Sequence, residues 1–162
     1  MRHPDKVAKL VLVCTWAACD AYARAVFEHF KTTRAVFRPE DFVSLLQLWI
    51  WSPSYFTAHE SELIETRTEA GTAENWQPSA AFAAQCDACI HHDTRAHLVR
   101  IAVPTLITAG EKDIFTPLPF ARELHAGIRG SELSFFPGAG HAHHWEDCER
   151  FNLGTIRFLH SC

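Results

Sequence analysis

The stretch Pro104-Thr-Leu-Ile-Thr-Ala-Gly110-Glu-Lys-Asp113 decides the fold, together with Pro137-Gly-Ala-Gly-His141 further along the chain. In the first stretch an apolar run ends at Gly110, and a carboxylate follows three residues later. In the second, a glycine-rich loop that follows the apolar run 132–136 presents an imidazole. An acid and then a histidine, each in the loop after a strand, form the second half of a serine–acid–histidine chain order. We therefore expect Asp113 and His141 to lie within hydrogen-bonding reach of each other.

Three short apolar runs predict β-strands, at residues 9–14, 103–109 and 132–136. The first run, Lys-Leu-Val-Leu-Val-Cys, is unbroken and rich in β-branched residues, which is typical of a strand buried on both faces of a parallel sheet. Helical stretches separate the runs, so we expect crossover connections and parallel strands. The predicted fold class is α/β, with about three parallel strands and an inserted helical cap.

The segment between residues 16 and 100 has little strand character and is divided by prolines. We expect helices at residues 20–33, 40–51, 54–71 and 79–92. The second of these is apolar nearly all round, which predicts burial on several sides or a position in a pocket wall. An insertion placed after a strand would lie over the carboxyl edge of the sheet, where open α/β folds bind ligands.

This reading divides the chain into a partial core, residues 1–16 and 93–162, and a helical cap or lid, residues 17–92. Within the core, Thr116 is expected to cap a helix that has Pro117 in its first turn and ends near Gly127. A last helix is expected at roughly residues 145–159.

The composition excludes several classes of protein. The 162 residues are 48% hydrophobic, carry a formal net charge of −4 and contain no run of Lys or Arg, which argues against a nucleic-acid partner or an acidic membrane surface. No apolar stretch is long enough to span a bilayer. The six cysteines are scattered in the sequence, and we expect free thiols in a cytoplasmic protein. They are Cys14, Cys19, Cys86, Cys89, Cys148 and Cys162.

Each catalytic candidate has an ordinary alternative when taken alone. Asp113 could be a turn residue, because aspartate is common in tight loops, and Glu111 competes with it from a position closer to the strand end. His141 could be a solvated loop histidine. The order of the two loops, with a punctuated helix between them, favours descent from a catalytic site.

The motifs resemble those of the α/β-hydrolase fold family, in the lactonase and aminoacrylate-hydrolase-like branch. The resemblance rests on IAVPTLITAGEKDIFTP (101–117) and GSELSFFPGAGHAHHWEDCERFN (130–152), and it covers the C-terminal half of such enzymes. It implies that Asp113 is the triad acid and His141 the triad base. It also implies hydrolysis of a small ester, lactone, amide or carbamate through an acyl-enzyme, with no organic cofactor.

The sequence departs from this family because it contains no Gly-x-Ser-x-Gly pentapeptide. The serines at 52, 54, 61 and 79 lack the strained strand-to-helix turn of a nucleophile. We therefore expect the chain to be inactive alone, as the C-terminal portion of a hydrolase completed by a separate nucleophile half. Two alternatives stay open: a non-catalytic association module or homodimer that pairs through the apolar edge at 9–14, and a fragment of a longer reading frame.

Two further groups of residues could bind a ligand. The histidines at 141, 143 and 144, and the pair Cys86 and Cys89 with the histidines at 91 and 92, offer metal ligands, but the spacing is a weak signal and we expect no metal. Trp16 and Phe115 follow the carboxyl ends of strands, and we expect both to contact the substrate. Packing in the core is the alternative role for these aromatic residues.

Overall fold

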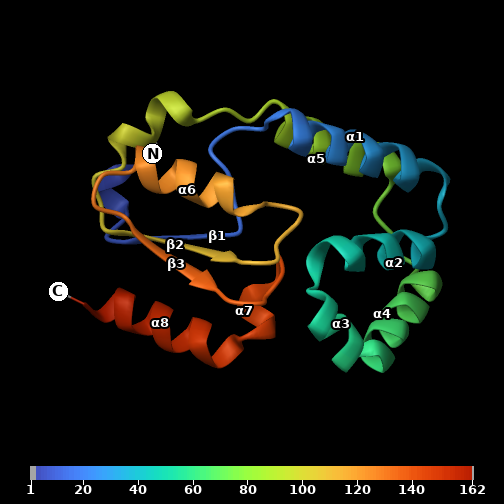
Figure 1. The fold of residues 1–162 in the computed structure, drawn as a ribbon. Coiled ribbons are helices and arrows are strands. Elements are labelled where there is room, and N and C mark those ends of the chain that lie inside the picture. Colours follow the sequence, from blue (N-terminus) through green and yellow to red (C-terminus); the bar gives the residue numbers. More distant parts are fainter. Residues whose placement is uncertain (1–2, 162) are drawn as a thin grey trace.

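The computed structural model describes residues 3–161, and its centre is a three-stranded parallel sheet (Figure 1). The strands are β1 (Leu10–Val13), β2 (Thr105–Gly110) and β3 (Glu132–Phe136), in the spatial order β1-β2-β3. In the register, Leu10 pairs with Thr105 and Gly110 with Phe136. The parallel α/β sheet expected from the sequence is thereby confirmed.

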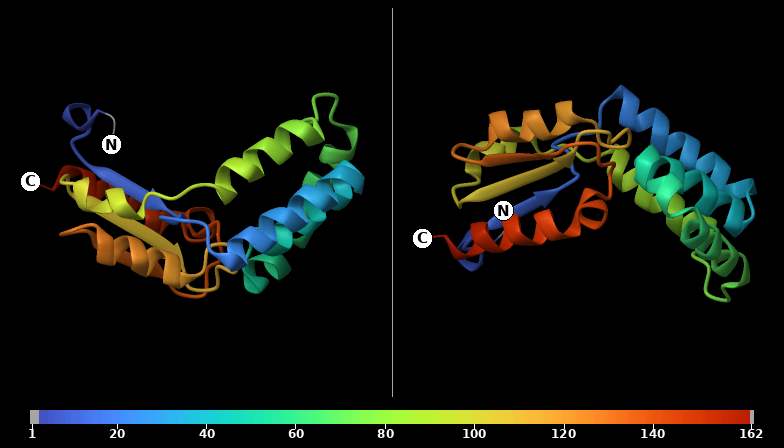
Figure 2. Two further views of the ribbon diagram at one scale, coloured as in Figure 1. Left: turned by 90° about the horizontal axis from the view of Figure 1, so that it is seen from above. Right: turned by 60° about the horizontal axis from the view of Figure 1, so that its bottom comes forward.

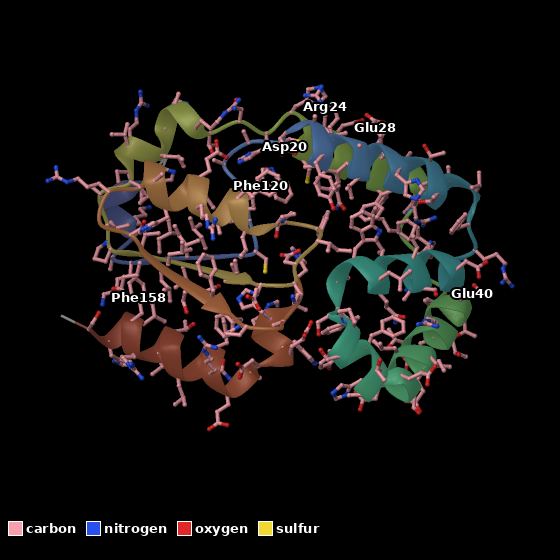
Figure 3. The ribbon with its side chains drawn as sticks, in the orientation of Figure 1. Asp20, Arg24, Glu28, Glu40, Phe120 and Phe158 are labelled. Atoms are coloured by element: carbon pink, nitrogen blue, oxygen red, sulfur yellow. The ribbon has the colours of Figure 1, made fainter. Side chains whose placement is uncertain are left out.

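Helices cover both faces of the sheet (Figure 1). Helix α6 (Leu118–Gly127) packs on one face against β2 and β3, and α8 (Cys148–His160) lies on the other face. Figure 3 shows Phe158 directed from α8 toward the strands, where it is buried. On the α6 side, the core is a cluster of buried aliphatic residues from β2, α6 and the segments beside them. Its members are Ala17, Leu98, Ile107, Ala109, Ala121, Leu124 and Ile128.

The cap is a second lobe of helices at the carboxyl ends of the strands (Figure 2). It contains α1 (Ala21–Val36), α2 (Pro39–Ile50), α3 (Pro53–Ala58), α4 (Glu60–Thr72) and α5 (Ser79–Ile90). Helix α1 packs along α5, and α2 packs along α4. Aromatic rings dominate the interior of this lobe, including Phe27 and Phe30 of α1, and Phe120 of α6 reaches into the same cluster (Figure 3).

Local sequence signals explain where several cap helices begin. The carboxylate of Asp20 accepts a hydrogen bond from Ala23 N at 2.8 Å and caps α1. Pro39 and Pro53 occupy the first turns of α2 and α3, where a missing N–H costs nothing. The hydroxyl of Ser52 accepts from Tyr55 N and caps α3.

Two predicted helices are in fact broken in two. The helix expected at 54–71 is interrupted at His59, whose backbone (φ −118°, ψ 23°) is not helical. The Tyr55 ring stacks between those of Trp51 and His59, with centroids 4.4 and 4.0 Å away, a local packing that hydrophobic periodicity does not reveal. The last helix is likewise preceded by a separate turn, α7 (His143–Glu146), because Asp147 (φ −129°, ψ 59°) leaves the helical region.

Three further expectations were wrong. Thr116 does not cap α6, since the capping position belongs to Pro117. Strand β1 is only half-buried along its length, because it is an edge strand with β2 on one side alone. Helix α2 is not apolar toward its neighbours all round: Leu48 is 57% exposed, whereas the polar Gln47 is buried and donates to Leu63 O at 3.0 Å.

The cysteines that the structure describes, at positions 14, 19, 86, 89 and 148, are free thiols, as expected, and Cys162 lies outside the described residues. Among the described residues, no helix combines the length and apolar character that crossing a membrane requires.

Candidate acid–base site

The loop after β2 holds Asp113 by hydrogen bonds from its own next few residues. One carboxylate oxygen, Oδ1, accepts from Phe115 N and Thr116 N, both at 2.8 Å, and Oδ2 accepts from Thr116 Oγ1 at 2.6 Å. An aspartate side chain that accepts hydrogen bonds from the backbone N–H groups two and three residues further on stabilises a turn. The Asp113 side chain is fully buried as a result, and Thr116 serves this carboxylate instead of the helix.

The loop after β3 brings His141 to the same carboxylate. Gly138 has a φ of +75°, which an L side chain rarely adopts, so glycine permits the turn there. His141 Nδ1 lies 2.9 Å from Asp113 Oδ2, and its side chain remains 22% exposed. Within the described part of the chain, His141 Nε2 has no hydrogen-bond partner. The two residues singled out from the sequence therefore lie together, with one ring nitrogen left available.

The electrostatics of the pair favour a charged carboxylate. Burial opposes ionisation, but the hydrogen bond and charge of His141, with the bonds from Thr116, outweigh it and hold the pKa of Asp113 below its ordinary value. An ionised Asp113 can only accept a hydrogen bond, so the proton of the neutral imidazole lies on Nδ1. Nε2 is then the nitrogen that can accept a proton. This is the tautomer that a general base requires.

Cys14 is a neighbour of the pair that the sequence analysis did not identify. It directly follows β1 and has a φ of +45°, an uncommon backbone conformation for a residue with a side chain. Its Sγ donates to His141 O at 2.6 Å and lies 3.0 Å from His143 Nδ1. Burial, and after it the Asp113 carboxylate, raises the pKa of the Cys14 thiol, so it is a protonated donor. Its position at the carboxyl edge of the sheet, shared with Asp113 and His141, was the signal that could have found it.

Cys14, Asp113 and His141 are also the one group of metal-ligating residues that the described part of the structure gathers, with ligand atoms within 4.8 Å of one another. All three are engaged in the hydrogen bonds just described, and a protonated thiol is a poor ligand. The histidine cluster weighed from the sequence is divided instead: His143 is buried against Cys14 and Thr108, whereas His144 is exposed.

Phe115 and Trp16 lie between the acid–base pair and the cap. The Phe115 ring centroid is 4.8 Å from that of His141, and on its other side it packs against Phe27 and Phe30 of α1. Trp16 packs edge-on against Phe115 at 6.4 Å. Its Nε1 is buried and has no hydrogen-bond partner among the described residues. Their contact with a substrate stays a prediction.

Glu146 joins the histidine loop to the cap, and the sequence analysis gave it no such role. Its Oε1 accepts from Ser52 N at 2.8 Å and from Gly140 N at 3.1 Å, and its Oε2 accepts from Ser52 Oγ at 2.6 Å. Ser52, which the sequence analysis judged an improbable nucleophile, is only 1% exposed, and its hydroxyl donates a hydrogen bond to this carboxylate. No local pattern reports a contact between residues so far apart in the chain.

A hollow of about 650 Å³ lies between α8 and the sheet, on the face away from α6. Leu106, Thr108 and Phe136 line it from the strands, and Phe151 and Phe158 line it from α8. Asp113 and His141 do not border it. The hollow is therefore separate from the Asp113–His141 pair, which lies at the carboxyl edge of the sheet.

The chain is similar to proteins named as hydrolases. No family model matches the chain. A protein of Serratia proteamaculans named as a carbamate hydrolase, RutD, is 28% identical over 159 residues, which are 98% of this chain and 59% of that protein. The crystal structure of MGS-M2, an α/β-hydrolase enzyme from a Medee basin deep-sea metagenome library, superposes with a TM-score of 0.84 at 18% identity. The enol-lactonase of Burkholderia xenovorans LB400 also gives a TM-score of 0.84, at 20% identity.

The matches cover nearly all of this chain but only part of the related proteins. The two crystal structures cover 99% of this chain, whereas the chain covers 59% of each of them. The chain thus spans about three-fifths of the length of the relatives it matches, a share that fits the C-terminal half of such proteins. These superpositions show that the chain has the fold of the C-terminal part of α/β-hydrolase enzymes.

Proposed function

We propose that this chain is the C-terminal portion of a serine hydrolase that acts on a small ester, lactone, amide or carbamate. The observation that carries the proposal is the hydrogen bond between His141 Nδ1 and buried Asp113, which leaves Nε2 available at the carboxyl edge of the sheet. The substrate class is supported by relatives named as a carbamate hydrolase and an enol-lactonase.

In the proposed mechanism, a serine hydroxyl placed beside His141 Nε2 attacks the carbonyl carbon of the substrate, and its proton passes to Nε2. Asp113 stays ionised and stabilises the imidazolium that forms. His141 then gives the proton to the leaving group, and the acyl-enzyme is hydrolysed by water through the same transfers in reverse. The 162 residues contain no Gly-x-Ser-x-Gly motif. The proposal therefore assigns the serine and the oxyanion-hole donors to the part of the relatives that this chain does not span.

Trp16 and Phe115 would form the wall of the substrate site on the cap side. Phe115 already contacts the His141 ring, so a substrate carbonyl beside Nε2 would lie near it. The buried, unpartnered Nε1 of Trp16 supports a role as a donor to a polar atom of the substrate, because buried donors are rarely left unsatisfied.

The test is a p-nitrophenyl acetate assay on the chain alone, and on the chain co-purified with the remaining N-terminal part of the Serratia relative. We expect background rates alone, and hydrolysis in the complex that is lost in His141→Ala. Hydrolysis by a formed complex that is unaffected by His141→Ala would refute the proposal. A rate by the chain alone that disappears in His141→Ala would refute only the assignment of the nucleophile to another segment.

A second candidate, a non-catalytic association module, is favoured by the edge of the sheet. Within the described residues β1 is an outer strand, so one side of its backbone lacks a strand partner, and such an edge is a template for pairing. A second copy of the chain, or a complementing half, would cover it. Sedimentation that shows a stable monomer at micromolar concentration would contradict this candidate.

A further inference from the structure

The junction between the cap and the histidine loop is built around one carboxylate. Glu146 accepts two hydrogen bonds from Ser52, which lies between α2 and α3, and one from Gly140, the residue before His141. It thus connects the cap, the histidine loop and α7 through a single side chain.

The two segments that Glu146 joins touch backbone to backbone. A Cβ atom added to Gly140 would lie 2.7 Å from Ser52 N and 2.8 Å from Ile50 O, so no larger residue fits without a shift. Beyond His141, Ala142 N donates to Ile50 O at 3.2 Å. His141 is therefore flanked on both sides by residues that contact the end of α2.

Within the described residues, the Glu146 carboxylate bonds Ser52 and Gly140 and makes no hydrogen bond to His141 itself. Its influence must pass through the backbone, because removing the carboxylate leaves the N–H groups of Ser52 and Gly140 without their acceptor in a buried place. The histidine loop would then settle differently against the cap, and His141 would move relative to Asp113, which its own loop holds in place.

We propose that Glu146 is a positioning residue: by bonding Ser52 of the cap and Gly140 together, it fixes the backbone that carries His141 and so couples the placement of the cap to the acid–base pair. The consequence of this role for catalysis rests on the proposed function. The geometric claim, that Glu146 sets the His141–Asp113 contact, can be measured in the 162-residue chain itself.

The experiment follows the Nδ1 proton of His141 by NMR in ¹⁵N-labelled protein, with Asp113→Asn used to assign it. In Glu146→Ala we expect this signal to exchange with water about tenfold faster or to vanish, as for a locally opened site. Glu146→Gln keeps a carbonyl oxygen for the amide donors and should retain the signal. The matched control is Glu149→Ala, which removes an exposed carboxylate three residues further on.

Ser52→Ala is the second variant, because Glu146→Ala could fail to fold. It leaves the Ser52 N–H bond to Glu146 in place and removes the hydroxyl, which donates to Glu146 and also caps α3 by accepting from Tyr55 N. Exchange should therefore accelerate by a smaller factor, about threefold. Unchanged exchange in Ser52→Ala, together with unchanged exchange in any folded Glu146→Ala, would overturn the positioning role and leave the proposed hydrolase function standing. A wild-type chain without the Nδ1 signal would overturn the acid–base pair and both proposals with it.

Discussion

The carboxylate of Asp113 and the loop of His141 differ in where the hydrogen bonds that hold them come from. Asp113 is held by Phe115 and Thr116, which are two and three residues away in sequence. The loop of His141 is held by Cys14, whose thiol is 127 positions away, and by the junction of Ser52 with Glu146, 94 positions apart. The bonds that orient the Asp113 carboxylate are therefore mostly local, whereas the loop of His141 is held by bonds that only the tertiary fold creates.

This difference teaches which half is vulnerable to distant changes. The bonds from Phe115 and Thr116 to the Asp113 carboxylate form within four consecutive residues, so changes at the junction of Ser52 with Glu146 should leave these bonds in place. The cap reaches this loop elsewhere, where Tyr22 of α1 donates to Ile114 O. The His141 loop depends on segments from β1 and from the cap, so the same changes should move the imidazole. The following substitutions test that contrast, from the largest expected effect to the smallest.

The strongest test of the acid is Asp113→Asn against Glu111→Gln in the complemented enzyme. An amide cannot stabilise the imidazolium or keep the productive tautomer, so we expect kcat to fall by about 10⁴-fold in Asp113→Asn. Glu111 is exposed and only supports Gly138 N, so Glu111→Gln should have little effect on kcat. A larger loss of kcat in Glu111→Gln than in Asp113→Asn would show that Glu111, and not Asp113, is the acid.

The pH dependence of stability probes the assembled half through His143. Burial, with the charge of His144, lowers the pKa of His143 to about 4, so the folded state resists protonation that the unfolded state accepts near pH 6.5. Stability is then fully present above pH 6.5 and is lost as the pH falls toward 4, by up to about 3 kcal/mol. Urea unfolding at several pH values checks this.

His143→Gln removes the titrating group and should flatten the slope between pH 6.5 and 4. The lowered pKa of Asp113 adds a second loss of stability that is confined to pH values below its ordinary value, because that carboxylate must be protonated there. The control is His29→Gln, which replaces an exposed histidine instead of a buried one. A slope that survives in His143→Gln would mean that other groups carry it.

Thr116→Val tests the local lock on the acid. Thr116 is buried, and its hydroxyl donates to the Asp113 carboxylate, so removing it should lower the free energy of unfolding by about 1.5 to 3 kcal/mol. Thr32→Val, at an exposed helix position, should change it by less than about 0.5 kcal/mol. If the two variants changed the free energy of unfolding equally, the hydrogen bond from Thr116 to Asp113 would not contribute to stability.

Two glycine substitutions compare the crowded histidine loop with open space. In Gly140→Ala the new methyl group meets the backbone of the cap junction, and we expect destabilisation of about 1 to 3 kcal/mol. Gly154 lies in α8 with nothing within 4 Å of an added Cβ, so Gly154→Ala should stabilise the chain by about 0.5 to 1 kcal/mol. Thermal unfolding of both variants tests whether the cap packs closely against the backbone at Gly140.

Much of the core could be predicted because its signals are short in range. The apolar runs that became β1, β2 and β3 were visible in the sequence, and so were the acid and the histidine that follow two of them. The interruptions at His59 and Asp147 were not visible, because neither is marked by a glycine or a proline that would end a helix. The half-burial of β1 depends on its position at the edge of the sheet, which no single strand pattern reveals.

By itself, the sequence determined the α/β class, the order of the strands along the chain and the placement of Asp113 and His141 in the loops that follow two of them, since those rest on neighbouring residues. Only the tertiary structure decided that Cys14 bonds the carbonyl of His141 and that Glu146 ties Gly140 to Ser52. The physical reason is distance along the chain: hydrogen bonds between residues about a hundred positions apart exist only after the sheet and the cap have brought their segments together.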